Sequence, residues 1–97
     1  MNIFIVGVGM GDTKYLTKIA EEKIKNADII IGAKRVAEPY VNEKKVFFEY
    51  ETDKIKKILE ENKCENAVIL FSGDTSFFSG AKKLKAEFPN AEIFAGI

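Results

Sequence analysis

Apolar residues along this chain are gathered into short runs separated by longer, mostly polar segments. Most runs are continuous rather than alternating with polar residues, a pattern typical of strands that are buried on both faces of a sheet. The predicted strands are residues 3–6, 29–31, 46–48, 67–70 and 93–95.

The segments between these runs show the spacing of amphipathic helices, predicted over residues 16–27, 53–63 and 77–87. A shorter helix within residues 32–40 is expected to stop before Pro39, because proline does not continue a helix. The candidate caps are Asp12 or Thr17 for the first helix and Thr52 or Asp53 for the second. The expected buried positions are Leu16, Ile19, Ala20, Ile24 and Ala27 with the stem of Lys23, then Ile55, Ile58 and Leu59, then Phe77, Ala81, Leu84 and Phe88.

Strand and helix alternate through the whole chain, which predicts an α/β fold. We expect a single domain, residues 1–97, in which a five-stranded parallel sheet lies between two layers of helices. Sheets of this kind bind ligands in the crevice outside the carboxyl ends of their strands. The loops after Val6, Ile31 and Leu70 are therefore the predicted place for chemistry.

The charge balance narrows the classes of partner. The 15 basic and 15 acidic residues cancel, which disfavours nucleic acid and anionic membrane surfaces. Cys64 is the single cysteine and there is no histidine, so neither an internal disulfide nor a multi-cysteine metal site is expected. No apolar run approaches the roughly 20 residues of a membrane helix. We expect a soluble, cytoplasmic protein.

The first loop has glycine at alternate positions, Gly7, Gly9 and Gly11, directly after a predicted strand. These glycines allow a ligand to approach the bare backbone, but a tight turn alone would explain them equally well. The dinucleotide fingerprint G-x-G-x-x-G fails, because Asp12 follows Gly11 and the second strand ends at Gly32 instead of a carboxylate. A P-loop pattern is also absent from the sequence. Nucleotide binding of these two kinds is not supported.

A second turn, residues 72–75, follows the fourth predicted strand and lies at the same edge of the sheet. One interpretation is purely structural: Asp74 or Ser76 caps the next helix, and Phe77 and Phe78 belong to the core. The other is that the turn contacts a ligand. Both interpretations are compatible, because a capped helix start still exposes backbone amides.

Taken together, four ordered segments resemble the tetrapyrrole methylase family. Residues 6–12 resemble its opening pattern VGxGPGD, Leu16-Thr17 and Ala27-Asp28 resemble its LT and AD, and residues 72–75 resemble its GDP loop at the expected distance. The resemblance covers essentially the whole chain. It implies the strand order 3-2-4-1-5 and an S-adenosylmethionine-dependent methyltransferase.

The turn after the second predicted strand is similar to one branch of this family. Residues 32–35, Gly-Ala-Lys-Arg, resemble the G-x-x-R of the cobalt-precorrin-7 (precorrin-6Y) C5-methyltransferases. The uroporphyrinogen branch has an aspartate where this chain has Ala33. The resemblance therefore implies methylation of a corrin-ring precursor in cobalamin biosynthesis, although a solvated turn would account for Lys34 and Arg35 equally well.

In this family S-adenosylmethionine lies between two domains, with the tetrapyrrole beside it. The resemblance implies that Asp12 is the catalytic carboxylate that removes or relays a proton, although it also suits a helix cap. Arg35 is expected to pair with an acetate or propionate of the macrocycle. The implied cofactor residues are Met10, Ser72, Gly73, Asp74 and Phe77, and the implied substrate residues are Gly9, Gly11, Asp12 and Arg35.

The chain also departs from the family. Met10 and Thr75 stand where the family has prolines, so both turns lose a fixed φ. The family continues past the position of Ile97 into a second domain, and the full-length protein is expected to be a homodimer. We therefore expect this chain to be an N-terminal domain that binds the cofactor weakly, is inactive alone and self-associates through an uncovered apolar face.

Two other interpretations remain open. The chain could belong to a different methylase of the superfamily that acts on another tetrapyrrole or on a protein. It could also be a standalone binding domain that has the fold without the catalysis. Met10 and Thr75 favour this last interpretation, whereas the Gly-Asp pairs at residues 11–12 and 73–74 favour an enzyme.

Overall fold

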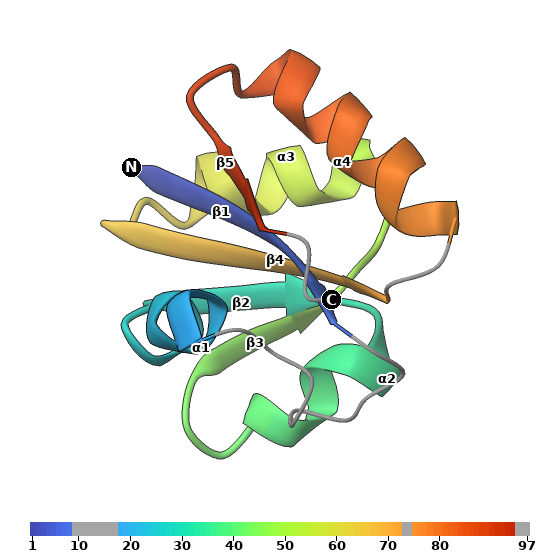
Figure 1. The fold of residues 1–97 in the computed structure, drawn as a ribbon. Helices are drawn as coiled ribbons and strands as arrows, with labels where there is room; N and C mark the ends of the chain where they lie inside the picture. Colours follow the sequence, from blue (N-terminus) through green and yellow to red (C-terminus); the bar gives the residue numbers. More distant parts are fainter. Residues whose placement is uncertain (9–17, 73–74, 95–97) are drawn as a thin grey trace.

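The computed structural model describes residues 1–8, 18–72 and 75–94, and for residues 8, 72 and 75–78 it describes the backbone alone. Five strands form one parallel sheet in the order β3-β2-β4-β1-β5 (Figure 1). The predicted fold class and strand order are confirmed. The strands are β1 (Asn2–Val8), β2 (Ile29–Gly32), β3 (Lys45–Phe48), β4 (Asn66–Ser72) and β5 (Glu92–Phe94), and the helices are α1 (Lys18–Lys25), α2 (Lys34–Ala37), the 3-10 helix η2 (Glu38–Tyr40), α3 (Thr52–Glu61) and α4 (Thr75–Glu87).

Each face of the sheet has its own hydrophobic core, because successive strand residues point to opposite faces. Ile5 and Ile69 pack on one face with apolar residues of α3 and α4. Val6 and Val68 pack on the other face with residues of α1 and α2. All four side chains are fully buried. The middle residues of the central strands are therefore apolar on both faces, which is why they appear in the sequence as continuous runs.

The connections between strands change direction once along the chain. The first two, through α1 and α2, move outward to β3 at one edge of the sheet, and the next two, through α3 and α4, return across it to β5 (Figure 1). Right-handed crossovers that run in opposite directions place their helices on opposite faces. This reversal accounts for the two helix layers.

The amino ends of β2 and β4 are tied together by Asp28 and Asn66. The Asp28 carboxylate accepts the backbone N–H groups of Asn66 at 2.9 Å and Glu65 at 3.1 Å, and the Asp28 N–H donates to the Asn66 carbonyl at 2.8 Å. The Asn66 side chain accepts a hydrogen bond from Asn2 and donates one to the carbonyl of Asn26. The acidic residue of the family's AD motif thus has a structural role at the edge opposite the predicted site.

Two details of the predicted helices are wrong. Ile19, which was expected in the buried stripe of α1, is 56% exposed, whereas Ala20 is fully buried. Adjacent helix residues lie about 100° apart around the axis, so Ile19 points past the sheet. Helix α3 has Glu51 at its N-cap, without a side-chain cap hydrogen bond, and the predicted caps Thr52 and Asp53 lie within its first turn.

The other helix predictions agree with the described residues. Helix α2 ends at Ala37 and the chain continues through Pro39 as a 3-10 helix. The Lys23 ammonium lies 4.6 Å from the centroid of the Phe4 ring, consistent with a stem that runs along the apolar stripe. Positions buried or partly buried as predicted are Ile24, Ala27, Ile55, Ile58, Leu59, Ala81, Leu84 and Phe88. Asp12, Leu16, Thr17 and the Phe77 side chain lie outside the described part of the chain.

Candidate ligand-binding cleft

Strands β1 and β4 end together at the carboxyl edge of the sheet. Their register runs from Asn2 opposite Asn66 to Val8 opposite Ser72. The chain leaves β1 across one face of the sheet and leaves β4 across the other, so this edge contains the topological switch point. Open parallel sheets bind their ligands at such points. The segments after β1 and β4 therefore begin side by side where a ligand is expected.

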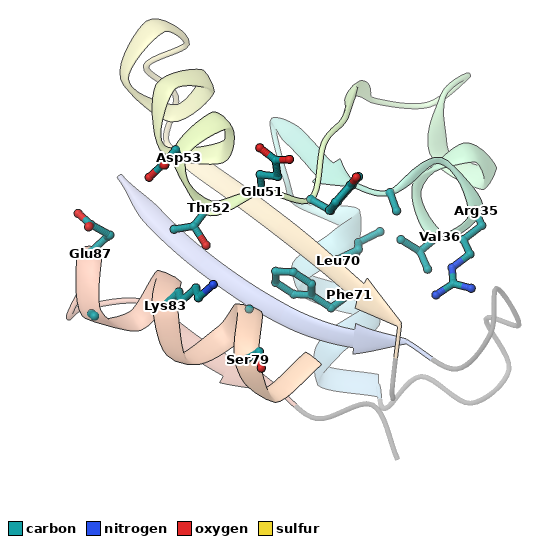
Figure 2. Close-up of a pocket in the computed structure, with 14 residues that line it drawn as sticks. Arg35, Val36, Glu51, Thr52, Asp53, Leu70, Phe71, Ser79, Lys83 and Glu87 are labelled. Atoms are coloured by element: carbon teal, nitrogen blue, oxygen red, sulfur yellow. The ribbon is translucent and has the colours of Figure 1, made fainter. Parts of the chain in front are cut away.

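A cleft of about 1020 Å³ opens near this edge (Figure 2). Leu70 and Phe71 of β4 lie in its centre, with α2 on one side and α3 and α4 on the other. The size and the mixed apolar and charged lining are typical of sites for small organic ligands. The other lining residues are Ala33, Arg35, Val36, Tyr50, Glu51, Thr52, Asp53, Ser79, Gly80, Lys83, Ala86 and Glu87.

Two glycines allow the close packing that shapes this cleft. A Cβ atom on Gly80 of α4 would lie 2.6 Å from the Phe71 ring, so the helix rests directly on the ring edge. A Cβ atom on Gly32, the last residue of β2, would lie 2.9 Å from the Leu70 carbonyl oxygen and 3.2 Å from Val36. Real Cβ atoms essentially never lie within 3.0 Å of such atoms, because the interior is densely packed. A side chain at residue 80 would therefore force the Phe71 ring to shift, and one at residue 32 would force the Leu70 backbone to shift.

Two basic side chains reach the cleft from opposite sides. Figure 2 shows Arg35 on the α2 side and Lys83 on the α4 side, with the Phe71 ring between them. Both side chains are exposed at their positions. Lys34, which precedes Arg35, is not among the lining residues. Of these two adjacent cations, Arg35, which the G-x-x-R motif singled out, is the one that lines the cleft.

Two of the acidic side chains that line the cleft form ion pairs with lysines. Glu87 of α4 lies 3.0 Å from the ammonium of Lys56 on α3, and Glu51 lies 3.9 Å from Lys54. Hydrogen bonding to Glu87, followed by its charge, raises the pKa of the Lys56 amino group above its usual value. The Lys56–Glu87 pair connects the two helices that flank the cleft.

Most of the predicted site residues cannot be placed. Gly9, Met10, Gly11, Asp12, Gly73 and Asp74 lie outside the described residues, as do the side chains of Ser72 and Phe77. The backbone of Ser72 ends β4, directly opposite the end of β1. Arg35 is the one predicted residue whose side chain is described, and it lines the cleft.

The cleft also contains residues that the sequence did not single out. Thr52, Phe71, Ser79 and Lys83 come from three elements that meet only in the fold. Phe71 directly precedes the second turn, and no role in ligand binding was predicted for it. A signal did exist for Gly80, because a glycine inside a helical pattern often marks a close approach.

The part of the chain described here has no group of three or more His, Cys, Asp or Glu side chains that could hold a metal ion. In the same residues, no helix has the length and hydropathy needed to cross a membrane.

The fold and the cleft define an open parallel α/β domain, a class of protein whose members bind ligands at the carboxyl edge of the sheet. Comparison with known protein families identifies the family within this fold class. The family model for "Tetrapyrrole (Corrin/Porphyrin) Methylases" matches residues 2–97. The chain belongs to the tetrapyrrole methylase family.

A relative is similar over nearly the same range. The "Probable cobalt-precorrin-7 C(5)-methyltransferase" of Methanocaldococcus jannaschii is 32% identical over 103 aligned residues, which include 98% of this chain and 49% of the relative. The chain therefore spans about half the length of the curated relative that it matches. The family and the branch suggested by the sequence motifs agree with these comparisons.

Proposed function

We propose that this chain forms the N-terminal domain of an S-adenosylmethionine-dependent methyltransferase that acts on a corrin-ring precursor in cobalamin biosynthesis. The named activity of the M. jannaschii relative supports C5 of cobalt-precorrin-7 as the methylated position. The structural observation that carries the proposal is the pairing of Val8 with Ser72, which starts both motif-bearing segments side by side at the switch point.

S-adenosylmethionine supplies an activated methyl group when it is bound. We assign its contacts to Met10, Ser72, Gly73, Asp74 and Phe77, because four of these flank the end of β4 and the fifth follows β1. The cleft beside β4 offers an apolar surface together with charged groups. Such a lining suits an amphipathic ligand that combines an aromatic ring, a cation and a carboxylate.

The corrin precursor is assigned to Gly9, Gly11, Asp12 and Arg35. Arg35 lines the cleft from the α2 side. Its planar guanidinium suits a carboxylate side chain of the macrocycle, because the two groups form paired, charge-assisted hydrogen bonds. Arg35 would thus orient the ring.

Methyl transfer places modest chemical demands on the protein. Bound S-adenosylmethionine would supply a methyl group on a positively charged sulfur, and the S–CH3 bond would break as the new C–CH3 bond forms, leaving a neutral thioether. The protein would therefore mainly position the two partners and exclude water. Asp12 is the carboxylate that we assign to removing or relaying a proton after transfer. A site of this kind does not require histidine, which this chain lacks.

We also propose that a complete cleft requires a second domain, as in the family. The isolated chain is then expected to bind S-adenosylmethionine with a dissociation constant weaker than about 1 µM, or about −8 kcal/mol. Isothermal titration of the 97-residue chain measures this directly. Micromolar or tighter binding would show that one domain is sufficient for the cofactor.

The activity itself is tested with a hybrid enzyme. In this hybrid, the present chain replaces the aligned half of the M. jannaschii relative, and the unchanged relative is the positive control. We expect transfer of a labelled methyl group to C5 of cobalt-precorrin-7, detected by mass spectrometry. A hybrid with native-like circular dichroism that methylates a different tetrapyrrole, or none, would contradict the proposal.

A further inference from the structure

The cleft crosses the carboxyl edge of the sheet from one helix layer to the other. Helix α2, which carries Arg35, packs on one face of the sheet through Val36. Helix α4, which carries Lys83, packs on the opposite face through Leu84. The two cations nonetheless line the same cleft, on opposite sides of the Phe71 ring (Figure 2). A ligand that contacts both cations therefore needs two separate anionic groups.

The direction of the Lys83 side chain follows from its position on α4. Side chains of a helix tilt toward the amino end of that helix. Helix α4 follows β4 along the chain, so Lys83 leans back toward the carboxyl edge of the sheet and toward Ser79, about one turn earlier. Figure 2 shows the ammonium nitrogen of Lys83 directed toward the Phe71 ring. Lys83 can therefore present its charge inside the cleft.

The described part of the chain offers the Lys83 ammonium no ion-pair partner. Glu87, four residues further along α4, is well placed to pair with Lys83, but its carboxylate lies 3.0 Å from the Lys56 ammonium instead. Glu87 first, and Asp53 to a smaller extent, raise the pKa of the Lys56 amino group, so both acids act on this lysine. Glu51, the other acid of the lining, lies 3.9 Å from a lysine of α3. The positive charge of Lys83 is therefore available to a ligand.

We propose that Arg35 and Lys83 bind two carboxylates of one planar macrocycle, which spans the cleft across the Phe71 ring. This inference rests on the proposed function, because it takes a corrin precursor as the ligand, and it adds Lys83 as a residue that selects the substrate. The cleft volume of about 1020 Å³ is at the upper end of the range for ligand sites, as a large ring requires. Thr52 and Ser79 also line the cleft, and their hydroxyls can donate hydrogen bonds to a carboxylate.

The number of acidic groups distinguishes the macrocycle from the cofactor. S-adenosylmethionine has a single carboxylate, which can engage only one of the two cations. A corrin precursor has acetate and propionate side chains around its rim, so it can engage both. Arginine forms a planar, paired contact with a carboxylate, whereas lysine is a point charge on a flexible stem. Arg35 would therefore fix one edge of the ring, and Lys83 would favour rings that have an acidic group on the opposite edge.

An NMR titration of the 97-residue chain tests this two-cation site without any methyl transfer. The probe is uroporphyrin, a stable macrocycle with acetate and propionate groups around its whole rim. Lys83→Gln should weaken uroporphyrin binding about fivefold, and Lys83→Arg should retain most of the affinity. Lys82→Gln is the matched control, because Lys82 is adjacent, exposed and outside the cleft lining. The backbone amide spectrum shows whether each variant is folded.

The variant Arg35→Gln tests whether both cations hold the same ligand. Either single variant, Arg35→Gln or Lys83→Gln, should weaken uroporphyrin binding, and the double variant should weaken it further. Protoporphyrin is the comparison ligand, because its propionates lie on one edge of the ring and can reach only one cation at a time. Either single variant should leave protoporphyrin binding almost unchanged, since the other cation remains.

Three results would overturn the proposal. The first is a chain that does not bind uroporphyrin, and the second is a Lys83→Gln variant that binds it as tightly as the unchanged chain. The third is a Lys83→Gln variant that loses affinity for S-adenosylmethionine instead, which would assign Lys83 to the cofactor.

The hybrid enzyme tests the proposed function separately. If uroporphyrin binding depends on both cations but the hybrid does not methylate cobalt-precorrin-7, the two-cation site stands and the proposed function fails. If the hybrid is active but uroporphyrin binding does not depend on Lys83, only the two-cation site fails.

Discussion

The Phe71 ring lies so close to Gly80 that a Cβ atom on this glycine would fall 2.6 Å from the ring's Cε1 atom. Strand β4 and helix α4 therefore meet without an intervening side chain. Because both residues line the cleft, the same contact determines how wide the cleft is beside Lys83. Any side chain at residue 80 has to displace either the ring or the helix.

The variant Gly80→Ala is expected to destabilise the fold. Alanine would favour the helix by about 1 kcal/mol, but overpacking against a buried ring costs about 1–3 kcal/mol. Urea denaturation measures the net loss. In a Phe71→Leu background, the same change should cost less because the ring edge is gone, while Ser79→Ala at the neighbouring exposed position should be nearly neutral. Equal losses in both backgrounds would contradict the contact.

The variant Gly32→Ala should be more damaging than Gly80→Ala. The atom nearest to the added methyl group is the Leu70 carbonyl oxygen at 2.9 Å, a backbone atom held in the sheet. Strands β2 and β4 would have to separate, at a cost of about 2–3 kcal/mol. Thermal denaturation of the two variants under the same conditions shows which variant loses more stability. A smaller loss for Gly32→Ala would mean that the strands adjust more easily than the helix.

Removing the Asp28 carboxylate should loosen the amino edge of the sheet. Asp28→Ala leaves two backbone N–H groups without their acceptor, and we expect a loss of about 1–2 kcal/mol in the free energy of unfolding. Asp28→Asn retains one side-chain acceptor oxygen and should lose less. Hydrogen exchange of the Glu65 and Asn66 amides provides a local measurement. Unchanged exchange in Asp28→Ala would show that these hydrogen bonds contribute little.

Alkaline pH should destabilise the fold through Tyr40. Burial, followed by the charges of Glu21 and Glu43, raises the pKa of the Tyr40 hydroxyl above its ordinary value of 10.0. The folded chain then holds the hydroxyl proton of Tyr40 more tightly than the unfolded chain does. The contribution of this proton to the free energy of unfolding is therefore fully present below pH 10.0, and it is lost as the pH rises through the higher pKa of the folded chain. Absorbance at an alkaline pH should reveal a late tyrosine ionisation that Tyr40→Phe removes and Tyr50→Phe retains.

Arg35→Ala should weaken substrate binding in the hybrid enzyme. Loss of a charge-assisted pair costs about 1.5–3 kcal/mol, so KM for the corrin precursor should rise roughly tenfold to a hundredfold while kcat changes little. Lys34→Ala is the matched control, because Lys34 is adjacent in sequence and outside the cleft lining. Steady-state kinetics measures both variants. Similar effects of the two variants would remove the assigned role of Arg35.

The sheet could be predicted from the sequence because parallel strands buried on both faces leave continuous apolar runs. Ile30 and Ile31 point to opposite cores, yet both are fully buried. Helix details were less predictable. Ile19 fits the periodicity of α1, but only the docking of the helix determines which apolar residues reach the sheet.

The candidate site could be predicted only in part. Arg35 followed from a motif that is local in the sequence, and it lines the cleft. Phe71 and Lys83 line the same cleft as Arg35 only because α4 packs on β4, a contact between segments that no local pattern encodes. The positions of residues 9–12 and 73–74 stay predictions.

The ties between Asp28 and Asn66 have a consequence for how such a domain can diversify. They align β2 and β4 at the amino edge, on the opposite side of the sheet from the cleft. Strand alignment is thus anchored at the edge of the sheet opposite the residues that line the cleft. Substitutions in the turns at the carboxyl edge can then alter the choice of substrate without changing how the sheet folds. These turns are therefore suitable for transplantation between relatives.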